Sequence, residues 1–129
     1  MKFRYTILYV DSVAATLDFY CRAFGVEQKM IHESGDYGEL STGDTSLSFS
    51  SKSLMTQLGK NPGSVDSSAP IFEIAFETGD VPAALKRAVD AGAKLVQDAE
   101  TMPWGQVTSY VHDIDGFLVE ICTPVSAPS

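Results

Sequence analysis

Three glutamates stand in the middle of predicted strands, where apolar side chains are the usual neighbours. Glu39 lies in the run YGEL and Glu120 in the run LVEI, which we place at matching points of two chain halves, and Glu73 lies in the run FEIAFE. Close carboxylates repel one another unless a cation or protons neutralise them. If their faces converge, these residues indicate a site for a divalent metal or a positively charged ligand. The alternative is a sheet face left to water.

Aromatic residues accompany these carboxylates. Trp104 is the only tryptophan, and it stands in the run MPWGQ just before a predicted strand. A loop position there makes its ring available to cover a ligand, although it can equally seal one end of the sheet. Tyr5, Tyr9, Tyr37 and Tyr110 are further candidates to line the site, but tyrosines are also common on half-exposed strands without any ligand.

Two amphipathic helices are predicted by apolar residues at helical spacing. The first covers residues 13–24, with Ser12 or Asp11 as its cap and Gly25 as its end. The second runs between Asp80 and Gly92, with a proline in its first turn. A shift of 68 positions, which takes residue 13 to residue 81, superimposes the two apolar faces. The chain is therefore predicted to contain a repeat.

Each helix follows one predicted strand and precedes three short ones. The strands are expected at residues 3–10, 27–33, 37–41 and 46–50, and at residues 71–77, 94–97, 107–112 and 117–123. We expect an α+β fold in which two βαβββ half-repeats form a curved, cleft-bearing mixed sheet with the helices outside. The half-repeats cover residues 3–50 and 70–124, residues 51–69 form a linker with a helical turn near residues 54–58, and residues 3–124 form a single domain.

Strand alternation assigns faces within each predicted sheet. In the second half, Phe72, Ile74 and Phe76 form the apolar face that must meet the helix, which turns Glu73 the other way. By the repeat, Tyr5 turns away from the first helix in the same manner.

The composition of the chain limits the classes of partner that it is expected to bind. The 129 residues carry a net charge of −8 and only nine basic residues, so the electrostatic attraction that dominates nucleic-acid binding has the wrong sign. Apolar runs are too short to cross a bilayer, and no signal peptide is evident. We expect a soluble, cytoplasmic protein that binds neither nucleic acid nor membrane.

The chain resembles the vicinal oxygen chelate superfamily, which includes glyoxalases, extradiol dioxygenases and bleomycin resistance proteins. The resemblance covers about residues 3–124 and rests on the runs YTILYVD, FYCRAFG and DIDGFLVE together with the repeat. It implies metal ligands on the first and last strand of each half, commonly two His or Gln and two Glu. The corresponding residues here are Tyr5, Glu39, Glu73 and Glu120.

The resemblance implies two alternative functions. The first is a homodimeric small-molecule-binding protein without metal, in which Tyr5 and Glu39 of one chain face Glu73 and Glu120 of the other, and Trp104 covers a cationic or aromatic compound. The alternative is a lyase, isomerase or dioxygenase of the glyoxalase type. There Glu39, Glu73 and Glu120 hold Ni, Mn, Zn or Mg, and Glu39 and Glu120 are the candidate catalytic residues.

Overall fold

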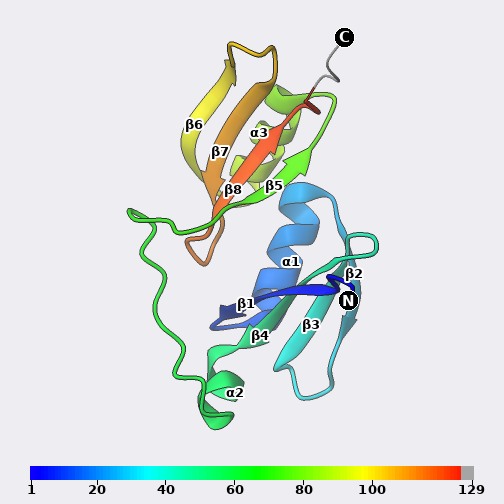
Figure 1. Cartoon of the computed structure of the whole chain (residues 1–129), viewed down its shortest axis with the longest axis vertical. Helices are drawn as coiled ribbons and strands as arrows, with labels where there is room; N and C mark the ends of the chain where they lie inside the picture. Colours follow the sequence, from blue (N-terminus) through cyan, green and yellow to red (C-terminus); the bar gives the residue numbers. More distant parts are fainter. Residues whose placement is uncertain (126–129) are drawn as a thin grey trace. The chain divides into compact units, whose positions relative to one another are not determined.

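Two compact units make up the chain (Figure 1), and each is described by itself. The computed structural model describes residues 1–125. The first unit is Met1–Ser64, and the second begins at Val65. No helix among residues 1–125 is long and apolar enough to cross a membrane.

The first unit is a four-stranded mixed sheet with a long helix on one face. Its strands lie in the order β1-β4-β3-β2, with β1 parallel to β4 and the other neighbours antiparallel. Its elements are β1 (Tyr5–Val10), α1 (Val13–Phe24), β2 (Glu27–Ile31), β3 (Tyr37–Ser41), β4 (Ser46–Ser51) and α2 (Lys52–Gln57).

The second unit repeats this topology. Its strands lie in the order β5-β8-β7-β6, and again only the first pair is parallel. Its elements are β5 (Ile74–Glu77), α3 (Val81–Asp90), β6 (Lys94–Thr101), β7 (Val107–His112) and β8 (Leu118–Cys122). The predicted α+β class with two βαβββ halves is thereby confirmed, whereas a single domain over residues 3–124 stays a prediction.

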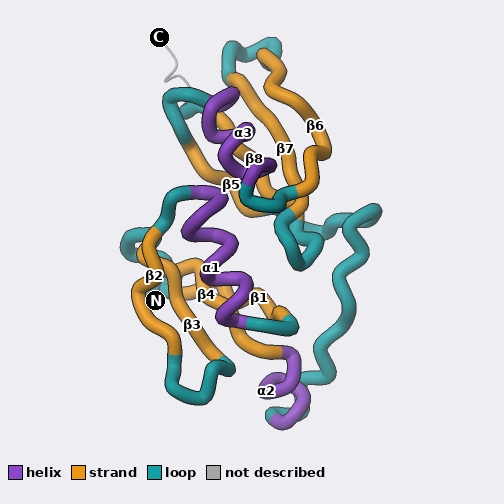
Figure 2. The backbone as a smooth tube through the Cα atoms, turned by 180° about the vertical axis from the view of Figure 1, so that it is seen from behind, coloured by secondary structure: helices purple, strands orange, loops and turns teal. Residues whose placement is uncertain are grey.

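Helix α1 has the predicted bounds because its ends are stabilised locally. The Ser12 side chain accepts a hydrogen bond from the Ala15 N–H, and Gly25 takes the left-handed conformation with φ 70° that ends the helix. Figure 2 shows α1 lying across one face of the β1-β4-β3-β2 sheet. Its buried face packs there, and the Tyr20 and Phe49 rings lie 5.1 Å apart.

Helix α3 begins and packs in the same way. Asp80 accepts from the Ala83 N–H, and Pro82 stands in the first turn, where its missing N–H costs nothing. Val81, Leu85 and Ala88 are buried toward the sheet of the second unit.

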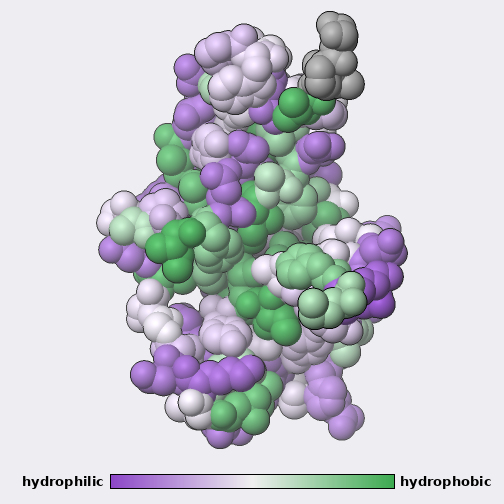
Figure 3. Space-filling view, in the orientation of Figure 1, coloured by the Kyte–Doolittle hydropathy of each residue, from purple (hydrophilic) through white to green (hydrophobic). Residues whose placement is uncertain are grey.

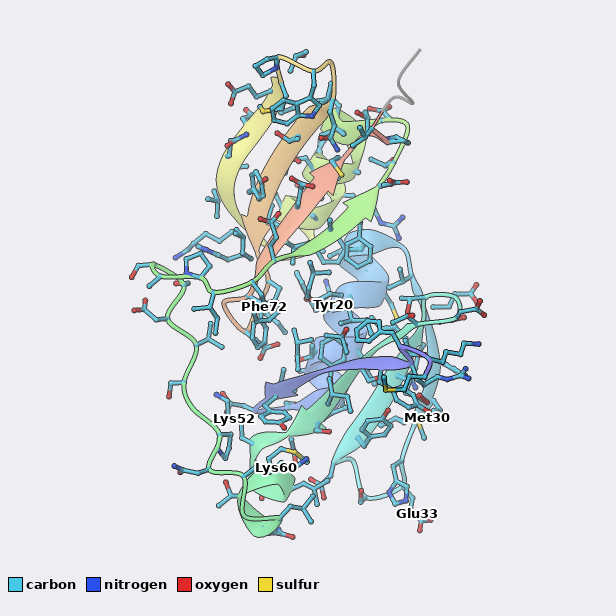
Figure 4. All side chains as sticks on the ribbon, in the orientation of Figure 1. Tyr20, Met30, Glu33, Lys52, Lys60 and Phe72 are labelled. Carbon is cyan, nitrogen blue, oxygen red and sulfur yellow. The ribbon has the colours of Figure 1, made fainter. Side chains whose placement is uncertain are left out.

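Phe72 departs from its predicted place on the helix-facing side of a strand. β5 begins only at Ile74, and the Phe72 ring is 43 % exposed and lies 5.7 Å from the Phe117 ring. Figure 4 shows Phe72 just before β5 begins. The alternation rule therefore holds for Ile74 and Phe76 but does not extend past the end of the strand.

Candidate functional site

The carboxylate of Glu120 lies at the centre of the second unit's sheet. Its register partners are Ala75 on β5 and Tyr110 on β7. The Tyr110 hydroxyl donates a hydrogen bond to Glu120 Oε2 at 2.5 Å. This hydrogen bond, then burial, and then the charges of Glu120 and Glu73 hold the pKa of Tyr110 above its ordinary value. The phenol is therefore a firmly protonated donor, and both carboxylates act on it.

Cys122 lies two residues beyond Glu120 on the same face. Burial first, and then Glu120 and Glu77, raise the pKa of the Cys122 thiol from 9.0 to about 11. Its Sγ donates to the Phe76 carbonyl at 3.7 Å. The thiol is thus protonated near neutral pH and unsuited to act as a nucleophile.

The first unit holds a second carboxylate, Glu39, in a more enclosed place. Glu39 on β3 is the register partner of Ser48 on β4 and of Met30 on β2, and Figure 4 labels the Met30 side chain at the β2 side of this sheet. Only 8 % of Glu39 is exposed. It belongs to none of the ion pairs found among residues 1–125, which join Arg22 to Asp18, Lys52 to Asp11 and Lys86 to Asp90.

Ser48 is fully buried beside Glu39, and its Oγ has no hydrogen-bond partner of good geometry. Tyr37 completes the group. Burial raises the pKa of Tyr37, and the nearby Ser48 hydroxyl lowers it as a hydrogen-bonding group. The Glu39 carboxylate raises it further through its charge and as a hydrogen-bonding group, and the charge of Tyr5 adds to this. These influences place Tyr5, Tyr37, Glu39 and Ser48 around one point on the sheet face that turns away from α1.

The predicted equivalence of Glu39 and Glu120 is wrong. Both sheets place the last strand of the unit beside the first, so Ser48 on β4 corresponds to Glu120 on β8, while Glu39 on β3 corresponds to Tyr110 on β7. The short runs YGEL and LVEI resemble each other because both are strands with one buried side. That likeness does not show which strand of one unit corresponds to which strand of the other. Sequence reasoning missed Ser48, although its run SLSFS alternates small polar and apolar residues.

The remaining aromatic candidates fall into two groups. Tyr5 and Tyr9 share the outward face of β1 with Ile7, and Tyr5 is 47 % exposed. Figure 3 shows apolar residues gathered over β1. Trp104 lies in the turn between β6 and β7, 59 % exposed, and its indole N–H donates to Gln106 Oε1 at 2.8 Å. Exposed aromatic side chains are therefore present in both units.

A family model matches nearly the whole of the chain. The model that describes the glyoxalase/bleomycin resistance protein/dioxygenase superfamily matches residues 2–121. No protein with a curated description matches the chain.

Several solved structures share the fold of this chain at low sequence identity. A glyoxalase/bleomycin resistance protein/dioxygenase family enzyme from Burkholderia phytofirmans PsJN is 19 % identical, with a TM-score of 0.83 over 98 % of this chain and 100 % of that one. A glyoxalase-related enzyme from Fulvimarina pelagi is 22 % identical, with a TM-score of 0.79 over 96 % and 88 %. TioX from Micromonospora sp. ML1 is 20 % identical, with a TM-score of 0.72 over 95 % and 98 %. These likenesses establish a shared fold.

Proposed function

This chain belongs to the glyoxalase/bleomycin resistance protein/dioxygenase superfamily, and from that premise we propose that it is a small-molecule-binding protein whose ligand is cationic and aromatic. The observation that carries the proposal is the enclosed carboxylate of Glu39, which no basic side chain among residues 1–125 neutralises. Burying a charge is costly unless an opposite charge or several hydrogen bonds compensate for it. A cationic ligand supplies that compensation.

Aromatic surface next to Glu39 supports a flat ligand. Glu39 and Tyr5 both raise the pKa of Tyr37, so the two tyrosines lie near Glu39, and about half of the Tyr5 surface is exposed. A cation held over a tyrosine ring gains about 0.5–2 kcal/mol from the ring's electron density. In the second unit, Tyr110 lies beside the carboxylates of Glu73 and Glu120, and Trp104 in the β6–β7 turn adds a further exposed ring. The net charge of −8 attracts cations over longer distances.

The residues at the family's ligand positions do not fit a metal. In the family those positions lie on the first and last strand of each half. Because β4 is the last strand of the first unit, they correspond here to Tyr5, Ser48 and Glu120, and to Glu73, which stands just before β5 rather than within it as predicted. A neutral phenol and a serine hydroxyl are weak ligands, which leaves two carboxylates. Within either unit, residues 1–125 contain no group of three or more His, Cys, Asp or Glu side chains able to hold a metal. This set of side chains does not support a metal-dependent step.

The proposal is tested with a matched pair of flat probes. The purified full-length protein is titrated by calorimetry with 9-aminoacridinium, which is cationic near pH 7.5, and with acridine, which is neutral there. We expect 9-aminoacridinium to bind at least about tenfold more tightly, since ion-paired hydrogen bonds contribute about 1.5–3 kcal/mol. Equal affinities, or no binding of either probe, would overturn the proposal.

Charge-removing variants sharpen this test. Glu39→Gln should weaken binding of the cation about tenfold, whereas Glu33→Gln, which removes the same charge from an exposed residue near the β2–β3 turn, should leave it unchanged. If both variants weaken binding equally, only the net charge matters and Glu39 has no special role.

The metalloenzyme alternative has its own measurement. Elemental analysis of the untagged protein is followed by titration of the metal-free form with nickel, manganese, zinc and magnesium. We expect no binding heat. About one metal per chain, lost in both Glu39→Gln and Glu120→Gln, would instead support a glyoxalase-type lyase, isomerase or dioxygenase.

We also propose that the protein is a cytoplasmic homodimer, as the family resemblance implies. Sedimentation equilibrium of the full chain tests the dimer, and a single monomeric species at micromolar concentration would contradict it.

A further inference from the structure

We propose that Ser48 and Glu39 form the subsite that holds the ligand's charged nitrogen, and that this nitrogen carries at least two N–H donors, as in a primary ammonium or an amidinium group. This inference rests on the proposed function and deepens it by assigning the residues and the ligand group. It places the polar contact in the first unit rather than around Glu120.

The register makes Ser48 and Glu39 neighbours on one sheet face. They lie directly opposite each other on antiparallel strands, where side chains are typically about 4.5–5.5 Å apart at their Cβ atoms. A single nitrogen between them can donate one N–H to the Glu39 carboxylate and another to the Ser48 hydroxyl. Ser48 and Glu39 both shift the pKa of Tyr37, so the Tyr37 hydroxyl lies beside them.

The unpartnered hydroxyl of Ser48 is the independent observation. Buried polar groups almost always have a hydrogen-bond partner, because leaving one unsatisfied costs about 1–3 kcal/mol. Ser48 Oγ is the buried side-chain oxygen or nitrogen within residues 1–125 that lacks such a partner. Ser48 lies next to Glu39, whose carboxylate has no ion-pair partner in the same part of the chain. A single cationic group with two N–H donors could therefore supply both the missing hydrogen bond and the missing counter-charge.

The second unit shows the satisfied form of the same arrangement. There the carboxylate is on the last strand and the hydroxyl on the third, and Tyr110 donates directly to Glu120. In the first unit the two groups are exchanged between the strands, and the shorter serine side chain makes no such bond to Glu39. In the first unit Tyr37 lies beside both groups, which shift its pKa, but Ser48 Oγ has no hydrogen-bond partner of good geometry in the described part of the chain and can still accept a donor.

Three flat probes separate charge from hydrogen bonding. 9-Aminoacridinium is a cation with an exocyclic NH2 group, N-methylacridinium is a cation without N–H donors, and acridine is neutral. Calorimetry is carried out on the wild-type full chain and on Ser48→Ala, Glu39→Gln and the control Ser109→Ala, whose hydroxyl is already bonded to the Ile121 carbonyl.

We expect Ser48→Ala to weaken 9-aminoacridinium binding about tenfold and to leave N-methylacridinium unchanged, because only the first probe donates to the hydroxyl. Glu39→Gln should weaken both cations, and Ser109→Ala should weaken neither. Amide chemical shifts of the wild-type protein should move around Glu39 and Ser48, which keeps the proposal testable if a variant fails to fold.

The outcomes separate this inference from the proposed function. If the cations bind but Ser48→Ala affects neither, or if the shifts are confined to residues around Tyr110 and Glu120, the subsite is overturned and the binding function stands. The same holds if Ser48→Ala weakens both cations equally. If no cation binds, the proposed function fails and this inference with it.

Discussion

The hydroxyl of Tyr110 donates a 2.5 Å hydrogen bond to the carboxylate of Glu120 directly across β7 and β8. The bond satisfies a partly buried charge with a neutral donor from the same unit. Glu39 and Ser48 hold the corresponding places on β3 and β4 without such a bond. The repeat therefore contains two unequal halves: in one, the carboxylate is hydrogen-bonded across the strands, and in the other, a buried carboxylate has no ion-pair partner and a buried hydroxyl has no hydrogen-bond partner among residues 1–125.

Replacing Tyr110 with phenylalanine should destabilise the protein. The change leaves the Glu120 carboxylate without its donor, and a hydrogen bond to a charged group contributes about 1.5–3 kcal/mol when buried. Because both side chains are partly exposed, we expect a loss of about 1 kcal/mol in the free energy of unfolding, measured by urea denaturation. Tyr9→Phe, which removes a hydroxyl from β1, should change stability by less than about 0.5 kcal/mol. Equal effects would show that the Tyr110–Glu120 bond contributes nothing specific.

The raised pKa of Cys122 predicts a loss of stability at alkaline pH. The folded-state pKa is about 11 against an ordinary 9.0, so the unfolded state releases its proton first as the pH rises. The stabilisation is fully present below pH 9 and is lost progressively between about 9 and 11. Between pH 8 and pH 10 the free energy of unfolding should fall by about 1 kcal/mol more in the wild type than in Cys122→Ala. Parallel pH profiles for the two proteins would contradict a raised thiol pKa.

The helices were predictable because their signals are local. Ser12 and Gly25 define both ends of α1 within the sequence itself, as Asp80 does for the start of α3. Strand existence was predictable from alternation, but strand ends were not, since pairing partners decide them. β5 begins at Ile74 because the register with β8 begins there, which left Phe72 outside the strand.

The site was only partly predictable because it depends on which strands are neighbours. Tyr5 was expected to turn away from the first helix, while Glu39 and Tyr37 were only candidates for the site. A local likeness between two runs suggested that Glu39 and Glu120 were equivalent. The order of strands in each sheet shows that the two residues are not equivalent, and this order is a property of the whole fold that no short run reveals. Ser48 could not be singled out at all, because a serine in a strand becomes notable only when burial and a missing partner are both known.

A methyl group at Gly38 should disturb the packing of α1 against β3. A Cβ there would lie 2.5 Å from Leu17 Cδ1, 3.1 Å from Val13 Cγ1 and 3.3 Å from the Met30 carbonyl oxygen. Leu17 is fully buried and cannot move aside freely. We expect Gly38→Ala to cost about 1–3 kcal/mol in thermal or urea unfolding.

The control for Gly38 is Gly79→Ala, where an added Cβ meets nothing within 4 Å. That variant should be close to neutral. A stable Gly38→Ala protein would mean that α1 does not pack as tightly on β3 as the structure shows.

Ser48→Ala and Ser109→Ala should change stability in opposite directions. Both serines are fully buried on central strands, but Ser109 Oγ donates to the Ile121 carbonyl at 2.9 Å whereas Ser48 Oγ has no partner. Removing the bonded hydroxyl should cost about 1 kcal/mol, and removing the unbonded one should gain up to about 1 kcal/mol, because its desolvation is no longer uncompensated. Urea unfolding of the three proteins in ligand-free buffer measures both shifts.

A serine that is kept for binding lowers the stability of the free protein, so a gain in Ser48→Ala together with weaker cation binding is the combination we expect. A loss of stability in Ser48→Ala equal to that in Ser109→Ala would mean that the Ser48 hydroxyl is already satisfied, most simply by a buried water molecule.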